Sequence, residues 1–548
     1  MIIRENLRDC RPKGNIRSAH SNQPSQNLLH RWRVIVKGLS DTERSDYVVG
    51  QDNVRIFGLD VHNPVFIVSA VLVVAFVAGT LLFLDSAGAA FSDMRVWITT
   101  KFDWTFMISM NVFVLFSLFV AFSSLGRVRL GGPDAKPRYG YPGWLAMLFA
   151  AGVGIGLMFY GVLEPVTHTL NPPLGIDSAN QPEAAAAGMS AAILHWGLHA
   201  WGVYAVVGLA LAFFCFNREL PLTLRSAFYP LLGEKVWGPI GHVIDITAVL
   251  ATIFGLATSL GLGAEQIAGG LNHLFNIEPT GTTKIVLITA IIAVALASVV
   301  AGLDKGVKRL SEFNMGLAGM LLLFVIIAGP TLFILKTMLT AAYDYARYLV
   351  PMSSWIDRGD EAFYHGWSTF YWAWWIAWSP FVGMFIARVS YGRTAREFIT
   401  WVLIIPTVIG IIWMSTFGGT ALHQLLTEGY RGVADAVPEL AMFKMLEGLP
   451  FSEFVSAIAL VLIAIFFITS ADSGSLVVDT ITAGGKMNAP VQQRVFWCVL
   501  VGLVAIVLLL GGGINSLQAL AISVGLPFSV VLLFMCVSLY KGMREEIS

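Results

Sequence analysis

The sequence predicts an all-α polytopic membrane protein, and three observations support this fold class. Hydrophobic residues make up 56% of the 548-residue chain and charged residues only 13%, a composition outside the range of water-soluble domains. The hydrophobic residues gather in runs of about 20, the length at which an α-helix crosses a ~30 Å hydrocarbon core. The segments between these runs alternate between many and few cations, as expected for loops on opposite sides of a membrane.

The first 64 residues form a polar segment. They hold ten Lys or Arg and seven Asp or Glu, and they contain neither a sustained hydrophobic period nor the hydrophobic run of a signal peptide. We therefore expect a cytoplasmic N-terminal tail over residues 1–64, a transmembrane domain over 65–540 and a short cytoplasmic C-terminus over 541–548.

From residue 65 onward the chain contains twelve hydrophobic spans. Of the 35 Lys and Arg, 27 lie in the tail and the even-numbered loops and only eight in the odd-numbered loops. The positive-inside rule then places both termini in the cytoplasm of a multi-pass protein in the cell (inner or plasma) membrane. The approximate limits of the spans are 65–84, 104–125, 144–164, 190–214, 237–263, 284–303, 312–337, 366–388, 397–419, 453–470, 494–512 and 517–540.

Several function classes lack support in the sequence. The formal net charge of zero suggests no nucleic-acid partner. Cys10, Cys215, Cys498 and Cys536 are too scattered for a disulfide framework or a metal site, so we expect no cofactor. An enzyme or a channel remains the alternative from another class, but neither a catalytic motif nor a ring of acidic residues supports it.

The eighth span is unusually rich in tryptophan, with five indoles within residues 367–378. At about 100° per residue, Trp374, Trp375 and Trp378 share one helix face just before the helix breaker Pro380. One interpretation is an aromatic belt at the membrane interface. The alternative, which three indoles on one face favour, is one wall of an aromatic cage.

The fourth span supplies a second aromatic face from Trp196, Trp201 and Tyr204. A quaternary ammonium has no N–H group, so the faces of aromatic rings are the remaining means of recognising it. The two aromatic faces therefore predict a cage for an onium group. His195 and His199 beside them are interpreted as hydrogen-bonded packing residues, with proton relays as the alternative.

The third span carries Gly152, Gly154 and Gly156, each of which costs roughly 1 kcal/mol relative to alanine inside a helix. They predict unwound backbone that lines a cavity, and its free amides would suit an anionic group. Close helix packing through Gly152 and Gly156 is the alternative. Glu164, before Pro165 at the end of this span, is interpreted as structural.

The third span, with its glycines, and the eighth, with Pro380 and Gly383, are those most prone to interruption. Two interrupted spans at matching positions indicate a transporter with inverted repeats, here spans 3–7 and 8–12. Residues 335–352 mix charged and hydrophobic residues and predict an amphipathic helix at the outer interface or against a neighbouring subunit.

The string WSTFYWAWWIAWSPFVGMFIAR, residues 367–388, resembles the signature of the betaine/choline/carnitine transporters, and the resemblance extends over about residues 58–540. It implies a LeuT-like core, two peripheral spans, a homotrimer and coupling to sodium. The glycine pattern of the third span is similar to that of sodium-coupled betaine carriers, whereas choline carriers similar to it have Asp at the position of Gly156.

The resemblance also implies sodium sites. Thr469 and Ser470, with the backbone oxygens of Ala150, Val153 and Phe466, would form the main one. A second sodium site would use Thr252 and Phe381. A further hydroxyl would be expected one turn after Thr252, but Leu256 occupies that position. Without the resemblance, these Ser and Thr hydroxyls would be expected to bond to carbonyls of their own helices.

We therefore expect a secondary transporter, and not an enzyme, that imports a zwitterionic quaternary ammonium or sulfonium compound by Na⁺ symport. The expected substrate is glycine betaine. A buried cation needs a counter-charge, and the carboxylate of glycine betaine supplies it within the same molecule. Choline, carnitine and dimethylsulfoniopropionate, with proton coupling in place of sodium, are the alternatives.

Overall fold

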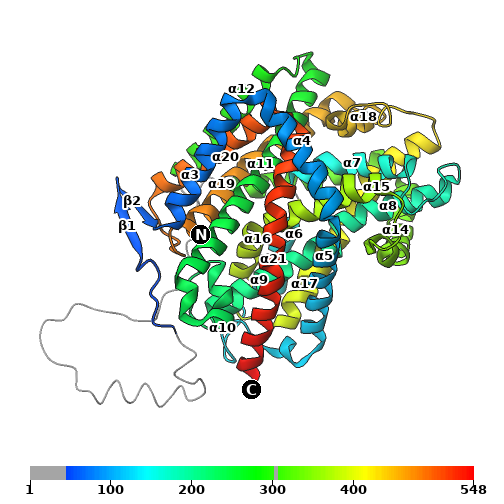
Figure 1. The fold of residues 1–548 in the computed structure, drawn as a ribbon. Helices are drawn as coiled ribbons and strands as arrows, with labels where there is room; N and C mark the ends of the chain where they lie inside the picture. Colours follow the sequence, from blue (N-terminus) through cyan, green and yellow to red (C-terminus); the bar gives the residue numbers. More distant parts are fainter. Residues whose placement is uncertain (1–44, 153, 302–306) are drawn as a thin grey trace, which may run out of the picture.

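The computed structural model describes residues 45–152, 154–301 and 307–548. Helices dominate, and a two-stranded hairpin stands at one side of the helical body (Figure 1). The longer helices are α3 (Val65–Leu82), α4 (Leu84–Lys101), α5 (Asp103–Phe122), α6 (Tyr141–Gly152), α7 (Ile155–Leu170), α8 (Gln181–Trp196), α9 (Leu198–Phe216), α11 (Pro239–Phe275), α12 (Gly281–Ala301), α13 (Val307–Ala328), α14 (Thr331–Ser353), α16 (Thr369–Val389), α17 (Ala395–Leu426), α19 (Ser452–Thr482), α20 (Val491–Leu510) and α21 (Ile514–Ile547). The short elements used below are β1 (Asn53–Ile56), β2 (Leu59–His62), α10 (Tyr229–Leu232), α15 (Glu361–Phe363) and α18 (Ala441–Glu447).

The all-α polytopic class predicted from the sequence is confirmed. Ten helical segments in the described chain are long and apolar enough to cross a membrane. They correspond to all the predicted spans except the third, which is divided between α6 and α7, and the Trp-rich eighth, which is α16. The count of twelve and the pairing of the spans as inverted repeats stay predictions.

The third span is interrupted where its glycines predicted a break. Helix α6 ends at Gly152, and α7 begins at Ile155 after Gly154 in extended conformation. The first amides of α7 have no intrahelical acceptor, as at every helix start. The break therefore places free amide donors in the middle of this span.

The expected interruption of the eighth span at Pro380 and Gly383 is wrong, because α16 continues through both residues. Pro380 has no N–H for the carbonyl of Ile376, but the Ser379 hydroxyl donates to that oxygen at 2.7 Å. Gly383 serves packing instead, since a Cβ there would lie 2.6 Å from Val207 Cγ1 of α9. The irregular backbone lies before α16, where residues 364–368 form a π-helical turn.

The centre of the molecule is α9, whose residues are buried almost without exception. It packs most extensively against α16, and α11 packs against both α19 and α21. These contacts, together with that of α16 against α11, bring the fourth, fifth, eighth, tenth and twelfth predicted spans around one region. Helix α14 confirms the helix expected over residues 335–352.

The part of the N-terminal tail that the structure describes is ordered in a way the sequence analysis did not foresee. Strands β1 and β2 pair antiparallel around Phe57 and Gly58, both at positive φ. Residues 1–44 of the predicted tail lie outside the described residues. At the other end, the segment expected as a separate C-terminus continues α21 to Ile547.

Candidate functional site

A cavity of about 290 Å³ lies among α6, α7, α8, α9, α11, α13, α16 and α19. The described residues that line it include neither an acidic nor a basic side chain. They are Ala150, Gly154, Ile155, Gly156, Trp196, Ala200, Trp201, Tyr204, Ser259, Ser311, Asn314, Met315, Trp374, Trp375, Trp378, Phe381, Val382, Phe385, Phe466, Thr469, Ser470 and Ser473.

All six aromatic residues predicted for an onium cage line this cavity: Trp196, Trp201, Tyr204, Trp374, Trp375 and Trp378. The indole of Trp196 stands steeply to two others, at 77° to Trp375 with ring centroids 4.8 Å apart and at 87° to Trp374 with centroids 6.3 Å apart. Tyr204 stands almost perpendicular to Trp375 at 6.1 Å and to Trp201 at 5.3 Å. The fourth and eighth spans thus supply adjoining walls of one aromatic enclosure.

The indole N–H groups of Trp196, Trp374, Trp375 and Trp378 are bound to acceptors of the protein. Trp375 Nε1 donates to the carbonyl oxygen of His195 at 2.7 Å, next to the break between α8 and α9 at Gly197. Trp374 and Trp378 both donate to the Gly255 carbonyl of α11, at 3.4 and 2.8 Å. These bonds fix the ring planes, so the rings can contact a ligand while their polar edges stay satisfied.

The glycines of the third span lie in different surroundings. At Gly156 a Cβ would come within 2.3 Å of Trp196 Cη2 and 3.0 Å of Trp374 Cη2, so two indoles approach the backbone there. A Cβ on Gly154 would meet open space, although Gly154 also lines the cavity. Gly152 ends α6. Gly156 is therefore a position of close packing, whereas Gly154 faces open space.

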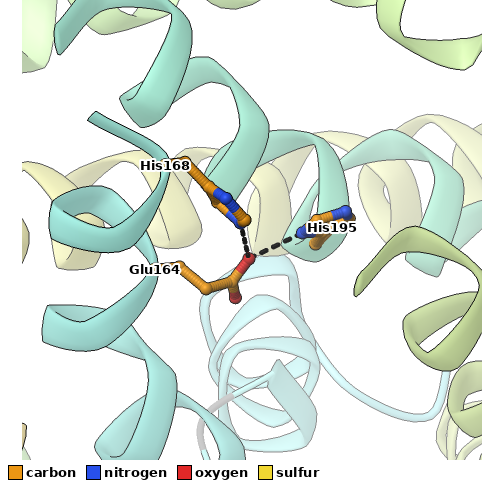
Figure 2. A group of neighbouring side chains, drawn as sticks. All are labelled: Glu164, His168 and His195. Atoms are coloured by element: carbon orange, nitrogen blue, oxygen red, sulfur yellow. Dashed lines mark hydrogen bonds and ion pairs between the residues drawn. The ribbon is translucent and has the colours of Figure 1, made fainter. Parts of the chain in front are cut away.

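Glu164, buried in α7, anchors one wall of the enclosure. Its Oε1 accepts from Trp196 Nε1 at 2.7 Å and from the Tyr371 hydroxyl at 2.5 Å. Its Oε2 lies 2.6 Å from His195 Nδ1 and 3.4 Å from His168 Nε2, and Figure 2 shows both imidazoles converging on the carboxylate. This geometry fits the structural role expected of Glu164, because the carboxylate orients the indole of Trp196.

Glu164, His168 and His195 are also residue types that ligate metals, and their ligand atoms lie within 4.8 Å of one another. However, Glu164 Oε2 and His195 Nδ1 are already at hydrogen-bond distance, and His195 Nε2 bonds to Ser368 Oγ at 2.9 Å. His199 Nε2 similarly bonds to Asn111 Oδ1 at 3.3 Å. These contacts agree with the interpretation of His195 and His199 as hydrogen-bonded packing residues.

Most residues expected at the main sodium site line the same cavity, namely Ala150, Phe466, Thr469 and Ser470. Val153 lies outside the described residues. The Thr469 hydroxyl donates to two carbonyls of its own helix, Ile465 at 3.0 Å and Phe466 at 3.2 Å. Its oxygen keeps lone-pair capacity for a cation, since a hydroxyl accepts as well as donates.

The residues expected at a second sodium site are not brought together in this cavity. Phe381 lines it, but Thr252 does not, and the Thr252 hydroxyl donates to the Ala248 carbonyl of its own helix at 2.7 Å. Leu256, one turn later, packs on α19 so closely that a Cβ on Gly474 would lie 2.2 Å from it. The position one turn after Thr252 on α11 therefore supplies no hydroxyl.

The sequence analysis missed four polar residues that line the cavity: Ser259, Ser311, Asn314 and Ser473. Asn314 is almost fully buried in α13. Asn314 could have been predicted from the sequence, because an amide side chain in an otherwise apolar span usually faces a cavity or a partner. The three serines gave no such signal, since serine is common in membrane helices.

Comparison with known proteins places the chain in a family. The family model described as "BCCT, betaine/carnitine/choline family transporter" matches residues 64–548. A glycine betaine/proline/choline transporter of Vibrio parahaemolyticus is 53% identical over 521 residues, which are 92% of this chain and 94% of that protein. Glycine betaine transporter 1 of the same organism is 53% identical over 515 residues, 92% of this chain and 98% of that protein.

More distant relatives agree. The glycine betaine transporter OpuD of Bacillus subtilis is 42% identical over 488 residues, 88% of this chain and 95% of that protein. Among solved structures, a manganese transporter of Eremococcus coleocola matches 76% of this chain and 82% of that chain at 14% identity with a TM-score of 0.36, too low to support an argument. The chain is therefore a membrane transporter and not an enzyme, and it belongs to the betaine/carnitine/choline transporter family.

Proposed function

We propose that this transporter imports glycine betaine together with Na⁺. The observation that carries the proposal is the uncharged cavity whose walls are the indoles of Trp196 and Trp375 and the phenol ring of Tyr204. A trimethylammonium group held against several ring faces gains ~0.5–2 kcal/mol from each. Three or four rings can therefore bind it without a carboxylate.

The net charge of the substrate follows from the same cavity. Burying a cation without a counter-charge is costly, whereas a zwitterion carries its own. We assign the carboxylate of the substrate to the backbone beside Gly154 and Gly156, because the first amides of α7 are free donors at a helix N-terminus. Gly152 would contribute through the shape of the break only.

The coupling ion would bind between α6 and α19. Ala150, Phe466, Thr469 and Ser470 all line the cavity, and carbonyl and hydroxyl oxygens are the ligands that a hard cation prefers. We propose a single sodium site here, with Val153 as a further backbone ligand. Thr252 and Phe381 are left out, because only Phe381 reaches the cavity.

Choline is the second candidate substrate, since a relative 53% identical is named for glycine betaine, proline and choline. The uncharged lining favours betaine over choline. Carnitine and dimethylsulfoniopropionate carry the same combination of onium and carboxylate groups, and a proton could replace sodium. The uptake experiment described below distinguishes these alternatives.

The assembly and the orientation are also part of the proposal. We propose a homotrimer in the cell membrane with both termini in the cytoplasm, as the cation distribution and the family suggest. Helix α14 is a candidate contact, because Leu332, Leu339, Tyr343 and Val350 are exposed on it.

The test is uptake into proteoliposomes containing the purified protein. Radiolabelled glycine betaine is supplied with an inward Na⁺ gradient, an inward H⁺ gradient or neither, and unlabelled choline, carnitine and dimethylsulfoniopropionate are added as competitors. The proposal expects accumulation with the Na⁺ gradient alone and weak competition by choline. Accumulation driven by H⁺ without Na⁺ would overturn the coupling, and preferential choline uptake would overturn the substrate.

A further inference from the structure

We propose that residues 45–62 form a pH-sensitive strap that ties α11 to the loop after α19 and is released when His62 takes up a proton. The strap comprises the segment before β1 and the β1–β2 hairpin, at the side of the helical body in Figure 1. It lies outside the substrate cavity, and none of its residues is among those lining it.

The strap binds the 3-10 turn Gly233–Trp237, which directly precedes α11, through an aromatic contact. Tyr47 stacks on Trp237 with ring centroids 4.1 Å apart and planes at 12°, and Trp237 Nε1 donates to Ser45 Oγ at 2.9 Å. Its other end binds the loop after α19, where Asn53 Nδ2 donates to the Ala483 carbonyl at 3.0 Å. Asp60 also pairs with Lys486 at 2.7 Å. The strap thus joins two helices that line the cavity.

His62 is the buried centre of this contact. Its side chain is fully buried, and neither ring nitrogen has a hydrogen-bond partner among the described residues. The imidazole of His242 lies 5.7 Å away, and the guanidinium of Arg225, 3.2 Å from His242, is the charge that acts on His62 most strongly. A buried site beside an arginine favours the neutral imidazole over the imidazolium.

The charged groups that act on His62 are Arg225 and His242, and no carboxylate is among them. Asp245 of α11 binds Arg225 at 2.5 Å, and Asp60 of β2 binds Lys486. Asp479 of α19 lies 3.8 Å from Arg494 of α20. Asp52 acts on Tyr47 and His242 and not on His62. A proton on His62 would therefore add a cation without a counter-charge.

Burial, together with Arg225 and His242, lowers the pKa of His62 to about 3 from its ordinary value of about 6.5. Docking is therefore strongest above pH 6.5, where His62 is neutral in both states. Below pH 6.5, His62 of the released segment takes up a proton that His62 of the docked segment cannot, which favours release. The equilibrium constant for docking falls about tenfold for each pH unit between pH 6.5 and 3. From pH 7.5 to 5.5 the released population should rise about tenfold.

Hydrogen–deuterium exchange of the full-length protein in detergent tests this inference. Strands of four residues do not form a stable hairpin alone, so release of the strap exposes the amides of residues 53–62 to exchange. After correction for the intrinsic pH dependence of exchange, we expect about tenfold weaker protection at pH 5.5 than at 7.5 in the wild type.

The variant His62→Leu removes the titrating group without removing a hydrogen bond and should make protection independent of pH. His62→Gln is a second neutral variant, in case Leu packs poorly. His365→Gln, at a histidine that pairs with Asp103 elsewhere, should keep the wild-type response. Equal protection at both pH values in the wild type, or an unchanged response in either His62 variant that remains docked at pH 7.5, would overturn the strap.

Discussion

The indole of Trp375 in α16 stands at 77° to that of Trp196, with ring centroids 4.8 Å apart, and the two N–H groups point to different acceptors. Trp375 is held by the backbone of His195 and Trp196 by the carboxylate of Glu164. Two perpendicular rings held in this way present faces to a tetrahedral onium group from two sides. The arrangement supports the proposed substrate and also shows which contacts a mutation can break.

Replacing Trp375 by Leu should abolish measurable betaine uptake while the protein still folds. Leucine suits the buried site but lacks the ring face that attracts a cation. Trp375→Phe should retain part of the activity, because one smaller ring remains. Uptake and thermal stability of the purified variants measure both effects, and Trp97→Leu, at an exposed position, is the matched control. Normal uptake by Trp375→Leu would remove this residue from the site.

Adding a methyl group at Gly156 should lower betaine affinity at least tenfold. The new Cβ would lie 2.3 Å from Trp196 Cη2, so the indole must move out of the enclosure. Gly154→Ala, two residues earlier and facing open space, should have a clearly smaller effect. KM for betaine in both variants measures the difference. Similar KM values would show that the close approach of Trp196 to Gly156 is unimportant for binding.

Glu164→Gln should raise the KM for betaine about tenfold and change the maximal rate less. The side-chain oxygen of glutamine can accept from Trp196 and Tyr371, but it lacks the full negative charge of a carboxylate. The second carboxylate oxygen beside His195 is also lost, so the Trp196 ring loses its fixed orientation. Steady-state uptake separates KM from the maximal rate. A loss of thermal stability with unchanged KM would make Glu164 a purely structural residue.

The hydrophobic runs and the positions of the tryptophans were sufficient to predict the helices and the aromatic walls. Those features depend on composition and on helical periodicity, which are local. The continuity of α16 depends on one contact, the Ser379 hydroxyl on the Ile376 carbonyl, which the presence of Pro380 does not reveal. The hairpin around Phe57 was missed because its strands are only four residues long and follow a polar tail.

The rest of the site was less predictable because it depends on which face each helix presents. Asn314 and Ser473 line the cavity through the rotation of α13 and α19, which composition does not determine. Thr252 illustrates the converse: its residue type fits a sodium ligand, but its hydroxyl bonds to its own helix.

The Ser379 contact gives a stability prediction. Ser379→Ala should destabilise the protein by about 1 kcal/mol or more, because the buried Ile376 carbonyl loses its donor. Adding Pro380→Ala should recover most of this loss, since alanine supplies the N–H that proline lacks. Thermal unfolding of the single and double variants measures the coupling. Additive losses in the double variant would show that the two residues act independently.

The last prediction concerns sodium. Thr469→Ala should raise the Na⁺ concentration for half-maximal uptake at least tenfold, because it removes a hydroxyl at the junction of α6 and α19, and Thr469→Ser should restore most of the affinity. Thr252→Ala should change it less than twofold, because this hydroxyl already bonds to the Ala248 carbonyl and does not reach the cavity. Betaine uptake over a range of Na⁺ concentrations distinguishes the variants. Equal effects at the two threonines would establish a second site, and full uptake without Na⁺ in the wild type would exclude sodium coupling altogether.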